Sequence, residues 1–256
     1  MTERTTGFLG NDWIRALRDL VIVVLGILVA FSLDAWWSHR ADQAQERSIL
    51  EGLYAEFSAN LESLEATMTE HRRSLDDSRQ LLQLIGPVSE AHDAEQLDSL
   101  VACFLISPSF EPTTGNLSAL LSSGTLHLIS NDSLRVKVAA WKDMLIDMKQ
   151  EEAEAELFLE QQILPFLFES FPLRTMDARS PVCSSGNTAD SRMGYTEGVG
   201  QSSFQADYSV LLTSLKFENM VDDRRFTSRF ILGKADAVQT ETEEIISLLQ
   251  AELEND

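Results

Sequence analysis

One uncharged run near the N-terminus constrains this chain more than any other feature. Leu20 to Leu33 contains 14 residues without a charge, inside the stretch DLVIVVLGILVAFSLDAWW that covers Asp19 to Trp37. As a helix this run is about 21 Å long, which is shorter than the ~30 Å hydrocarbon core of a bilayer. Its length alone leaves three interpretations open: a membrane span, a cleaved signal peptide or a buried core helix.

The residues that flank the run favour a membrane span. Trp13 lies before it and Trp36 and Trp37 lie after it, roughly 35 Å apart along a helix, as aromatic belts at two membrane interfaces would be. Arginine side chains at the start of the run can extend toward the headgroups. We therefore predict a transmembrane anchor at residues 20–37, with these residues at its ends and interfaces: Trp13, Arg15, Arg18, Leu20, Leu33, Trp36 and Trp37.

Insertion energetics agree with a span that stays uncleaved. The eleven Leu, Ile, Val and Phe residues of the run contribute roughly −3 to −6 kcal/mol, against at most ~3 kcal/mol for Asp34. A signal peptide remains the main alternative, because Ala30-Phe31-Ser32 places small residues at the spacing of a cleavage site. No Pro or Gly interrupts the helix after the run, however, and the sequence DAWWSHRADQAQERSILEGLYAEF continues as a good helix.

The charge of the chain limits its partners. The sequence holds 20 Lys and Arg against 41 Asp and Glu, and residues 38–256 alone carry a net charge of −20. Phosphate backbones would repel such a body, so we expect no nucleic-acid partner. Anionic headgroups would repel it as well, which leaves the apolar span as the contact with the lipid bilayer. The remaining partner classes are another protein and a second copy of the chain.

The distribution of positive charge gives a weak signal for orientation. Three arginines precede the span, while Arg40 and Arg47 follow it, so the excess on the N-terminal side is slight. No second hydrophobic run follows, and the body therefore lies on one side of the membrane. We predict a single-pass protein of the bacterial inner membrane with its C-terminal body on the extracytoplasmic side.

A regular apolar pattern follows the span. The helix is expected to continue to Ile85, where Gly86-Pro87 ends it. Apolar residues recur within it at alternating intervals of four and three, a five-heptad seam typical of helix packing and coiled coils. The seam consists of Leu50, Tyr54, Phe57, Leu61, Leu64, Met68, His71, Leu75, Ser78, Leu82 and Ile85. It must pack against helices of the same chain or against a second copy, and we expect the former.

Capping signals predict further helices downstream. Asp93 and Gln96 are typical of a capping box that opens a short helix. In TTGNLSALLSSGTLHLISNDSLR, Thr113 or Thr114 can cap a second short helix that Gly124 ends.

Similar capping and helix-breaking signals occur in the second half of the chain. Ser130 or Asn131 can cap a longer helix, which Pro165 is expected to kink or stop. Residues 172–203 have the composition of a long irregular loop. Helical patterning resumes at Asp207 and continues to the C-terminus.

These signals together predict an all-α fold. An N-terminal transmembrane helix continues into a long helix that packs in a helical bundle. We divide the chain into a short tail (residues 1–19), the anchor (20–37) and an acidic helical domain (38–256).

The chain has two cysteines, Cys103 and Cys183. In an oxidising compartment they can form a disulfide, which would close a loop of ~80 residues and contribute roughly 4 to 5 kcal/mol in the chain-entropy model. The alternative is two reduced thiols, with Cys103 in the core. We expect a disulfide only if the body is extracytoplasmic.

Two stretches carry a resemblance to a known group of proteins. The span with its trailing LDAWW, and the later TTGNLSALLSSGTLHLISNDSLR, resemble a bacterial family of uncharacterised single-pass membrane proteins with an N-terminal anchor and an all-helical body. The resemblance implies a membrane anchor and a helical domain. It implies no activity, cofactor or site residue.

The sequence supports no catalytic, cofactor-binding or metal-binding assignment. The acidic group Glu151, Glu152, Glu154 and Glu156 is interpreted as a solvated helix face, and the four histidines His39, His71, His92 and His127 are scattered. We expect the ring of His71 at the partly hydrated edge of the seam, with a pH-sensitive interface contact as the alternative.

The expected function is therefore that of a membrane-anchored scaffold or accessory subunit rather than that of an enzyme. Two alternatives stay open. One is a small-molecule sensory domain that works through a partner, and the other is an unrecognised metal-dependent hydrolase.

Overall fold

The structure of the chain is a computed structural model that describes residues 9–88, 93–174, 202–204 and 206–255, without the side chains of residues 9–12, 14–16, 95 and 255. Every regular element among these residues is a helix, which confirms the all-α prediction. In chain order they are α1 (Leu9–Leu84), α2 (Ala94–Phe104), α3 (Gly115–Ser123), η1 (Thr125–Leu128), α4 (Asp132–Phe158), η2 (Leu159–Ile163), α5 (Leu164–Ser170), α7 (Ser209–Leu212) and α8 (Leu215–Asn255).

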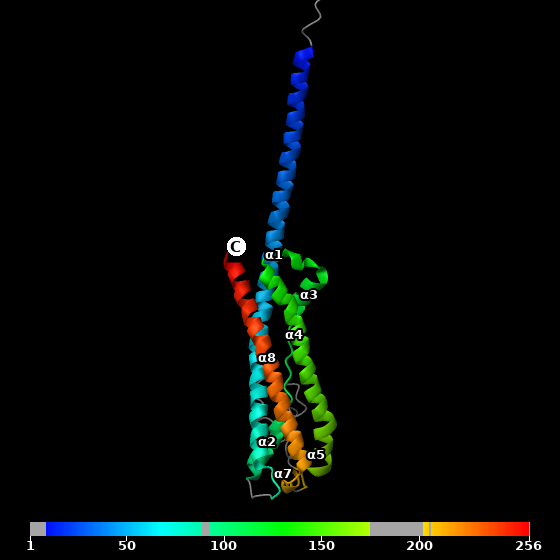
Figure 1. Cartoon of the computed structure of the whole chain (residues 1–256), viewed down its shortest axis with the longest axis vertical. Coiled ribbons are helices and arrows are strands. Elements are labelled where there is room, and N and C mark those ends of the chain that lie inside the picture. The colour runs from blue at the N-terminus through cyan, green and yellow to red at the C-terminus, as the bar shows by residue number, and fades with distance from the viewer. Residues whose placement is uncertain (1–8, 89–92, 175–201, 205, 256) are drawn as a thin grey trace, which may run out of the picture.

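Helix α1 joins the predicted anchor to the body without a break. It is 76 residues long, which corresponds to about 114 Å. Its N-terminal part projects alone from the body, and its C-terminal part packs within it (Figure 1). The helix begins at Leu9, so residues 9–19 of the expected tail are helical. The first buried residue of α1 is Leu50.

The body is a bundle of three long helical segments. Helix α8 runs antiparallel to α1, because Ser74 contacts Ser228 and the side chain of Gln239 donates a hydrogen bond to Glu65. It also runs antiparallel to α4, since Lys137 pairs with Glu241 near one end of α4 and Asp147 pairs with Lys234 further along it. Helices α1 and α4 therefore run in the same direction, away from the span (Figure 1).

Aromatic packing joins the three helices at Trp141 of α4. Its ring lies 5.0 Å, centroid to centroid, from that of Phe57 on α1, in an edge-on arrangement. The indole Nε1–H donates a 2.8 Å hydrogen bond to Oγ1 of Thr242 on α8. A buried Trp stabilises a core most when its N–H has such a partner. The residue is 1% exposed, so it lies at the centre of the part of the bundle nearest the span.

The seam residues face other elements of the same chain. Leu50, Phe57, Leu64, Met68, His71, Leu75 and Ser78 are buried, and Tyr54, Leu61, Leu82 and Ile85 are half-buried. Leu53, Asn60 and Leu81 are buried as well, so the stripe is wider than the heptad pattern predicted. The physical reason is that α1 packs against α8 on one side and against α2, α3 and the chain between them on the other.

Two of the predicted helix caps are present in the structure. Gly124 ends α3 with φ of +71°, a left-handed conformation that glycine adopts without steric cost. The side chain of Asn131 accepts a hydrogen bond from the backbone N–H of Leu134 and so caps α4. The predicted cap at Thr113 or Thr114 is wrong: Thr114 occupies the N-cap position of α3, but its side chain makes no capping bond.

Pro165 does not stop the helix that contains it. The chain forms a π-helical turn, η2, immediately before this residue, and the backbone N–H of Leu164 donates to the carbonyl of Leu159, five residues back. Helix α5 then continues to Ser170 with Pro165 in its first turn. Pro165 has no backbone N–H to donate to the preceding turn, so one helical hydrogen bond is absent there. A π turn is a common way to accommodate such a local change in helical hydrogen bonding.

Candidate functional site

A non-helical segment runs between the helices of the body and needs hydrogen-bond partners. Residues 105–114, which we call the crossover segment, connect α2 at the end far from the span to α3 at the near end. Buried backbone N–H and C=O groups are almost always paired, and only the ends of this segment do so with described backbone groups, at Leu105, Ile106 and Thr114. The neighbouring helices must therefore provide the partners through their side chains.

Near the span, these partners come from α1. Asn60 forms two bonds with Thr113: its amide donates to the backbone carbonyl (2.7 Å), and its carbonyl oxygen accepts from the backbone N–H (2.8 Å). The carboxylate of Glu56 accepts from the backbone N–H groups of Asn116 (2.6 Å) and Leu117 (3.0 Å). Glu56 therefore caps α3 from another helix, where a negative charge also interacts favourably with the helix dipole.

At the far end, α8 provides the partner. Arg224 is buried, and its guanidinium donates to the backbone carbonyls of Phe104 (3.0 Å) and Ile106. These carbonyls lie at and just beyond the C-terminus of α2, where a cation interacts favourably with the helix dipole. Burial lowers the pKa of Arg224 to about 10, so the side chain keeps its charge at neutral pH.

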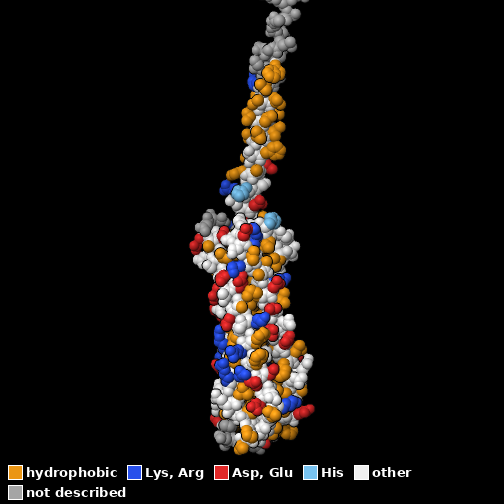
Figure 2. Space-filling model, in the orientation of Figure 1, with side chains coloured by type: hydrophobic (Ala, Val, Ile, Leu, Met, Phe, Trp, Pro, Cys, Tyr) orange, Lys and Arg blue, Asp and Glu red, His pale blue; other side chains and the backbone are white. Residues whose placement is uncertain are grey.

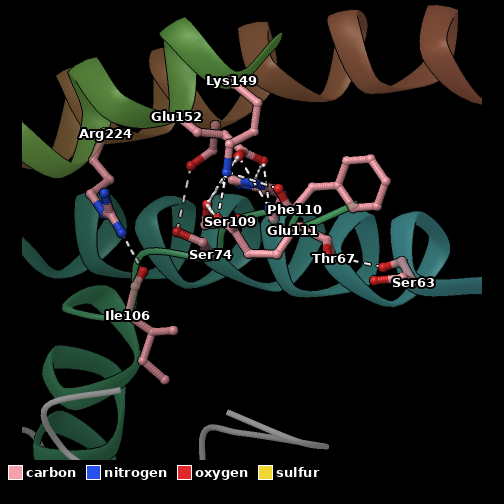
Figure 3. A network of polar contacts seen from close by, with 12 residues as sticks. Ser63, Thr67, Ser74, Ile106, Ser109, Phe110, Glu111, Lys149, Glu152 and Arg224 are labelled. Carbon is pink, nitrogen blue, oxygen red and sulfur yellow. Dashed lines mark hydrogen bonds and ion pairs between the residues drawn. The ribbon is translucent and has the colours of Figure 1, made fainter. Parts of the chain in front are cut away.

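The middle of the crossover segment is held by α4 (Figure 3). Both carboxylate oxygens of Glu152 lie within hydrogen-bond distance of the backbone N–H of Phe110 (3.2 and 3.1 Å), and Oε2 also accepts from the hydroxyl of Ser109 (3.2 Å). Lys149 donates to the carbonyl of Phe110 (2.8 Å) and to the carboxylate of Glu111 (2.6 Å). The bond from Lys149 lowers the pKa of Glu111.

Two sequence-based interpretations of this region are wrong. Glu152 belongs to a group predicted to be solvated, yet it is 4% exposed, because the crossover segment covers that face of α4. His71, predicted to be partly hydrated, is 3% exposed, and its Nε2 lies 3.5 Å from Oε1 of Glu152 without forming a hydrogen bond. Neither position carries a local signal that a segment 40 residues away would cover it.

This polar network orders the backbone and has little room for a ligand. A small cavity beside it is lined by Glu70, Arg73, Ser74, Asp77, Cys103 and Ile106, and its volume of about 10 Å³ matches one water molecule. Within the described ranges, no three His, Cys, Asp or Glu side chains are grouped to hold a metal ion. His39 and His127 are exposed, and His92 lies outside those ranges.

The carboxyl of Asp77 faces this cavity. Its Oδ2 is buried and has no hydrogen-bond partner among the described residues. Burial raises the pKa of Asp77 from 3.8 to about 6, although Arg73 acts in the opposite direction.

The structure describes one of the two cysteines of the predicted disulfide. Cys103 is half-buried beside the same cavity and is disulfide-bonded. Cys183 lies outside the described residues, as does most of the predicted irregular loop at 172–203. The pairing therefore stays a prediction.

The predicted anchor has no protein around it. One helix in the described part of the chain, α1, is long and apolar enough to cross a membrane, and none of its apolar stretch is buried. Figure 2 shows this stretch as a continuous apolar surface above the polar body. The exposed fractions are 71% for Trp13, 59% for Leu20, 62% for Leu33, 50% for Trp36 and 69% for Trp37. A signal sequence near the N-terminus would meet the same criteria.

Arg18 pairs with the adjacent Asp19 at 3.1 Å. The side chain of Arg15 lies outside the description.

No protein-family model, curated protein or solved structure matches the chain. The resemblance to a family of single-pass membrane proteins therefore stays a prediction.

Removing the charge of Glu56 should destabilise α3. In Glu56→Gln, one of the two backbone N–H groups faces an amide NH₂ instead of an oxygen, and the helix dipole loses its anion. We expect a loss of about 1 to 2 kcal/mol in the free energy of unfolding, together with faster hydrogen exchange at the amides of Asn116 and Leu117. The control is Glu51→Gln on the same helix, an exposed residue paired with Arg47, which should change stability by less than about 0.5 kcal/mol. Equal effects of the two substitutions would contradict the capping role.

Replacing Asp77 should stabilise the body in a pH-dependent way. The pKa of Asp77 is higher in the folded chain than its ordinary value, so the folded state binds the proton more tightly than the unfolded state does. Stability is then lost as the pH rises from about 4 to 6, and the cost of the ionised carboxyl is fully present above that range. Asp77→Asn avoids this cost, and we expect a gain of roughly 1 kcal/mol at pH 8, reduced from the full shift because the group is partly hydrated.

The measurement is urea unfolding of the two proteins at pH 8 and pH 5. The gain from Asp77→Asn should be clearly smaller at pH 5. Asp147→Asn is the control, because Asp147 is exposed, paired with Lys234 and not among the groups that shift the pKa of Asp77. A gain that does not depend on pH would show that the carboxyl of Asp77 is not protonated more readily in the folded chain.

Proposed function

We propose that this chain is a single-pass membrane protein whose helical body acts through protein contacts, as a scaffold or accessory subunit. The observation that carries the proposal is the continuity of α1. The same helix contains an apolar stretch that nothing in the protein buries and, from Leu50 onward, the packing face of the bundle. Such a helix fixes the body to whatever surrounds its apolar end.

The geometry of α1 gives the body a defined reach. From Trp37 to Leu84 the helix extends roughly 70 Å, at 1.5 Å per residue. If Trp37 lies at the membrane interface, the far end of the bundle projects by that distance into the adjoining compartment. We propose the extracytoplasmic side of a bacterial inner membrane, which fits the disulfide at Cys103, since disulfides persist in oxidising compartments.

The far end of the bundle carries an exposed apolar surface, which we call the distal tip. It consists of one side chain from each of five segments: Val88 (77% exposed), Phe168 (70%), Phe204 (79%), Val210 (45%) and Leu215 (69%). The end of α1 is tied to α7 by the hydrogen bond from Gly86 N–H to the carbonyl of Leu212, and Lys216 of α8 lies over the ring of Phe166 on α5. We infer that these side chains together form a contact surface, since exposed apolar groups at one end of a protein are typical of protein contacts.

Membrane insertion and orientation can be tested together. The full chain, produced in a Gram-negative bacterium with a C-terminal alkaline phosphatase, should stay in the membrane after carbonate extraction, keep its N-terminus and show phosphatase activity. Placing two arginines one turn apart in the span, Val24→Arg with Leu28→Arg, costs about 5 to 7 kcal/mol of insertion energy and should release the protein. The matched control Ala41→Arg with Gln45→Arg should leave it in the membrane. Loss of ~3 to 4 kDa from the N-terminus would show a signal peptide instead, and an inactive phosphatase would place the body in the cytoplasm.

Protein contact at the distal tip can be tested by photo-crosslinking in the cells that naturally produce the protein. Replacing Phe168 with benzoylphenylalanine keeps an aromatic side chain at the tip, and irradiation should give a discrete adduct with another protein or a second copy. The control position is Val136, an equally exposed apolar residue (68%) near the start of α4, outside the tip. An adduct at neither position, or the same products at both, would contradict a contact role for the tip.

A further inference from the structure

We propose that Trp36, Trp37 and Arg40 form a binding site for the phosphate group of a membrane phospholipid. The inference rests on the proposed membrane span and adds to it a ligand class and the residues that contact the ligand. It comes from the one exposed surface in the described part of α1 where aromatic rings and a cation lie together beside the apolar stretch.

The three side chains form one surface on α1. The guanidinium carbon of Arg40 lies 5.5 Å from the centroid of the Trp36 ring, and the rings of Trp36 and Trp37 lie 6.2 Å apart in an edge-on arrangement. The side chains of Trp36, Trp37 and Arg40, with Ala41, line an open pocket on the surface of the helix. Both rings are at least half exposed, so the surface is accessible from the side of the helix.

The N–H groups of Arg40 make no hydrogen bond to the other described residues, so they can bind a ligand. Its only contact with the described residues is the ring of Trp36, and no carboxylate pairs with it there. The arginines on either side along α1 differ in this respect, since Arg18 pairs with Asp19 and Arg47 pairs with Glu51. A guanidinium presents five N–H groups in a planar arrangement that matches phosphate oxygens, and a ring face holds it in place without using those groups.

The position of Arg40 along the helix matches the depth of lipid phosphates. The uncharged run from Leu20 to Leu33 is centred near residue 26 or 27. Along a helix, Trp36 lies roughly 14 Å and Arg40 roughly 20 Å from this centre. The hydrocarbon core ends at about 15 Å from the midplane, and the headgroup region extends to about 20 to 22 Å. Trp36 and Trp37 therefore lie at the edge of the hydrocarbon, and Arg40 lies among the phosphates.

The negative charge of the body disfavours lipids whose headgroups carry a further anionic group. The expected ligand is therefore the phosphate that all phospholipids share. The body beyond residue 37 carries a net charge of −20, which repels an anionic membrane surface at longer range. The phosphate is common to zwitterionic and anionic phospholipids. We therefore expect binding of both classes, with Arg40 contacting the phosphate and the tryptophan rings contacting the glycerol and upper acyl region.

The test measures lipid binding by native mass spectrometry of the full chain in detergent, titrated with phosphatidylcholine. The wild-type protein should retain one lipid, and Arg40→Gln should weaken its binding about tenfold. Trp36→Leu should weaken it as well, because Arg40 then loses the ring that orients it. The matched control is Arg47→Gln, which removes the same charge two turns further along α1. Equal binding by wild type and Arg40→Gln, or equal loss in Arg40→Gln and Arg47→Gln, would overturn the site.

Two further measurements identify what is recognised. Diacylglycerol, which lacks the phosphate, should bind as weakly to the wild type as phosphatidylcholine does to Arg40→Gln; tight diacylglycerol binding would show that only the acyl chains matter. Inorganic phosphate at 10 mM should not displace the lipid, and displacement would indicate a site for free phosphate. All variants should stay in the membrane after carbonate extraction. Release of the wild type would instead refute the proposed span, a failure distinct from loss of lipid binding.

Discussion

The body of this protein depends on how the backbone of the crossover segment is paired. At its two ends the segment shares backbone hydrogen bonds with α2 and α3, but between these ends its N–H and C=O groups bond to side chains of the neighbouring helices. Asn60, Glu152 and Arg224 provide these bonds from three different helices, and Glu56 caps α3 directly after the segment. A buried polar group left without a partner costs about 1 to 3 kcal/mol, whereas a whole domain is stable by only about 5 to 15 kcal/mol. A few such side chains therefore decide whether the bundle forms.

Features that depend on residues close together in the sequence were predicted, whereas features that depend on residues far apart in the sequence were not. The long helices follow from apolar periodicity, and the caps at Gly124 and Asn131 follow from neighbours a few residues away. The cap of α3 was assigned to Thr113 or Thr114 because local signals point there, but the acceptor is Glu56, about 60 residues earlier. The burial of Glu152 has the same origin, since Phe110 lies 42 residues away. The residues of this network look like ordinary surface residues until the crossover segment is placed.

The continuity of α1 makes the span and the body one mechanical unit. Residues 38–49 connect them as a helix whose side chains are almost all exposed, and the body contacts this part near its end, where the carboxylate of Glu46 accepts hydrogen bonds from the backbone N–H (2.6 Å) and hydroxyl (3.0 Å) of Ser130. This connecting part contains no Pro or Gly, and an uninterrupted helix of this kind bends only gently. In the proposed membrane arrangement, the depth and tilt of the span would therefore set the position of the distal tip. A site that fixes the interface at Arg40 would limit the vertical movement of the whole bundle.

The buried polar residues also divide the core into two parts. One apolar cluster, near the span, includes Phe57 and Trp141, and the other, at the far end, includes Phe104 and Phe217. Between them lies a layer that contains His71, Ser74, Glu152, Arg224 and Ser228. If α8 slipped along α1 by one heptad, Arg224 would move into an apolar cluster without carbonyl partners, which is costly for a buried charge. An all-apolar layer would tolerate such a slip more easily. The polar layer therefore favours a single register of the three helices.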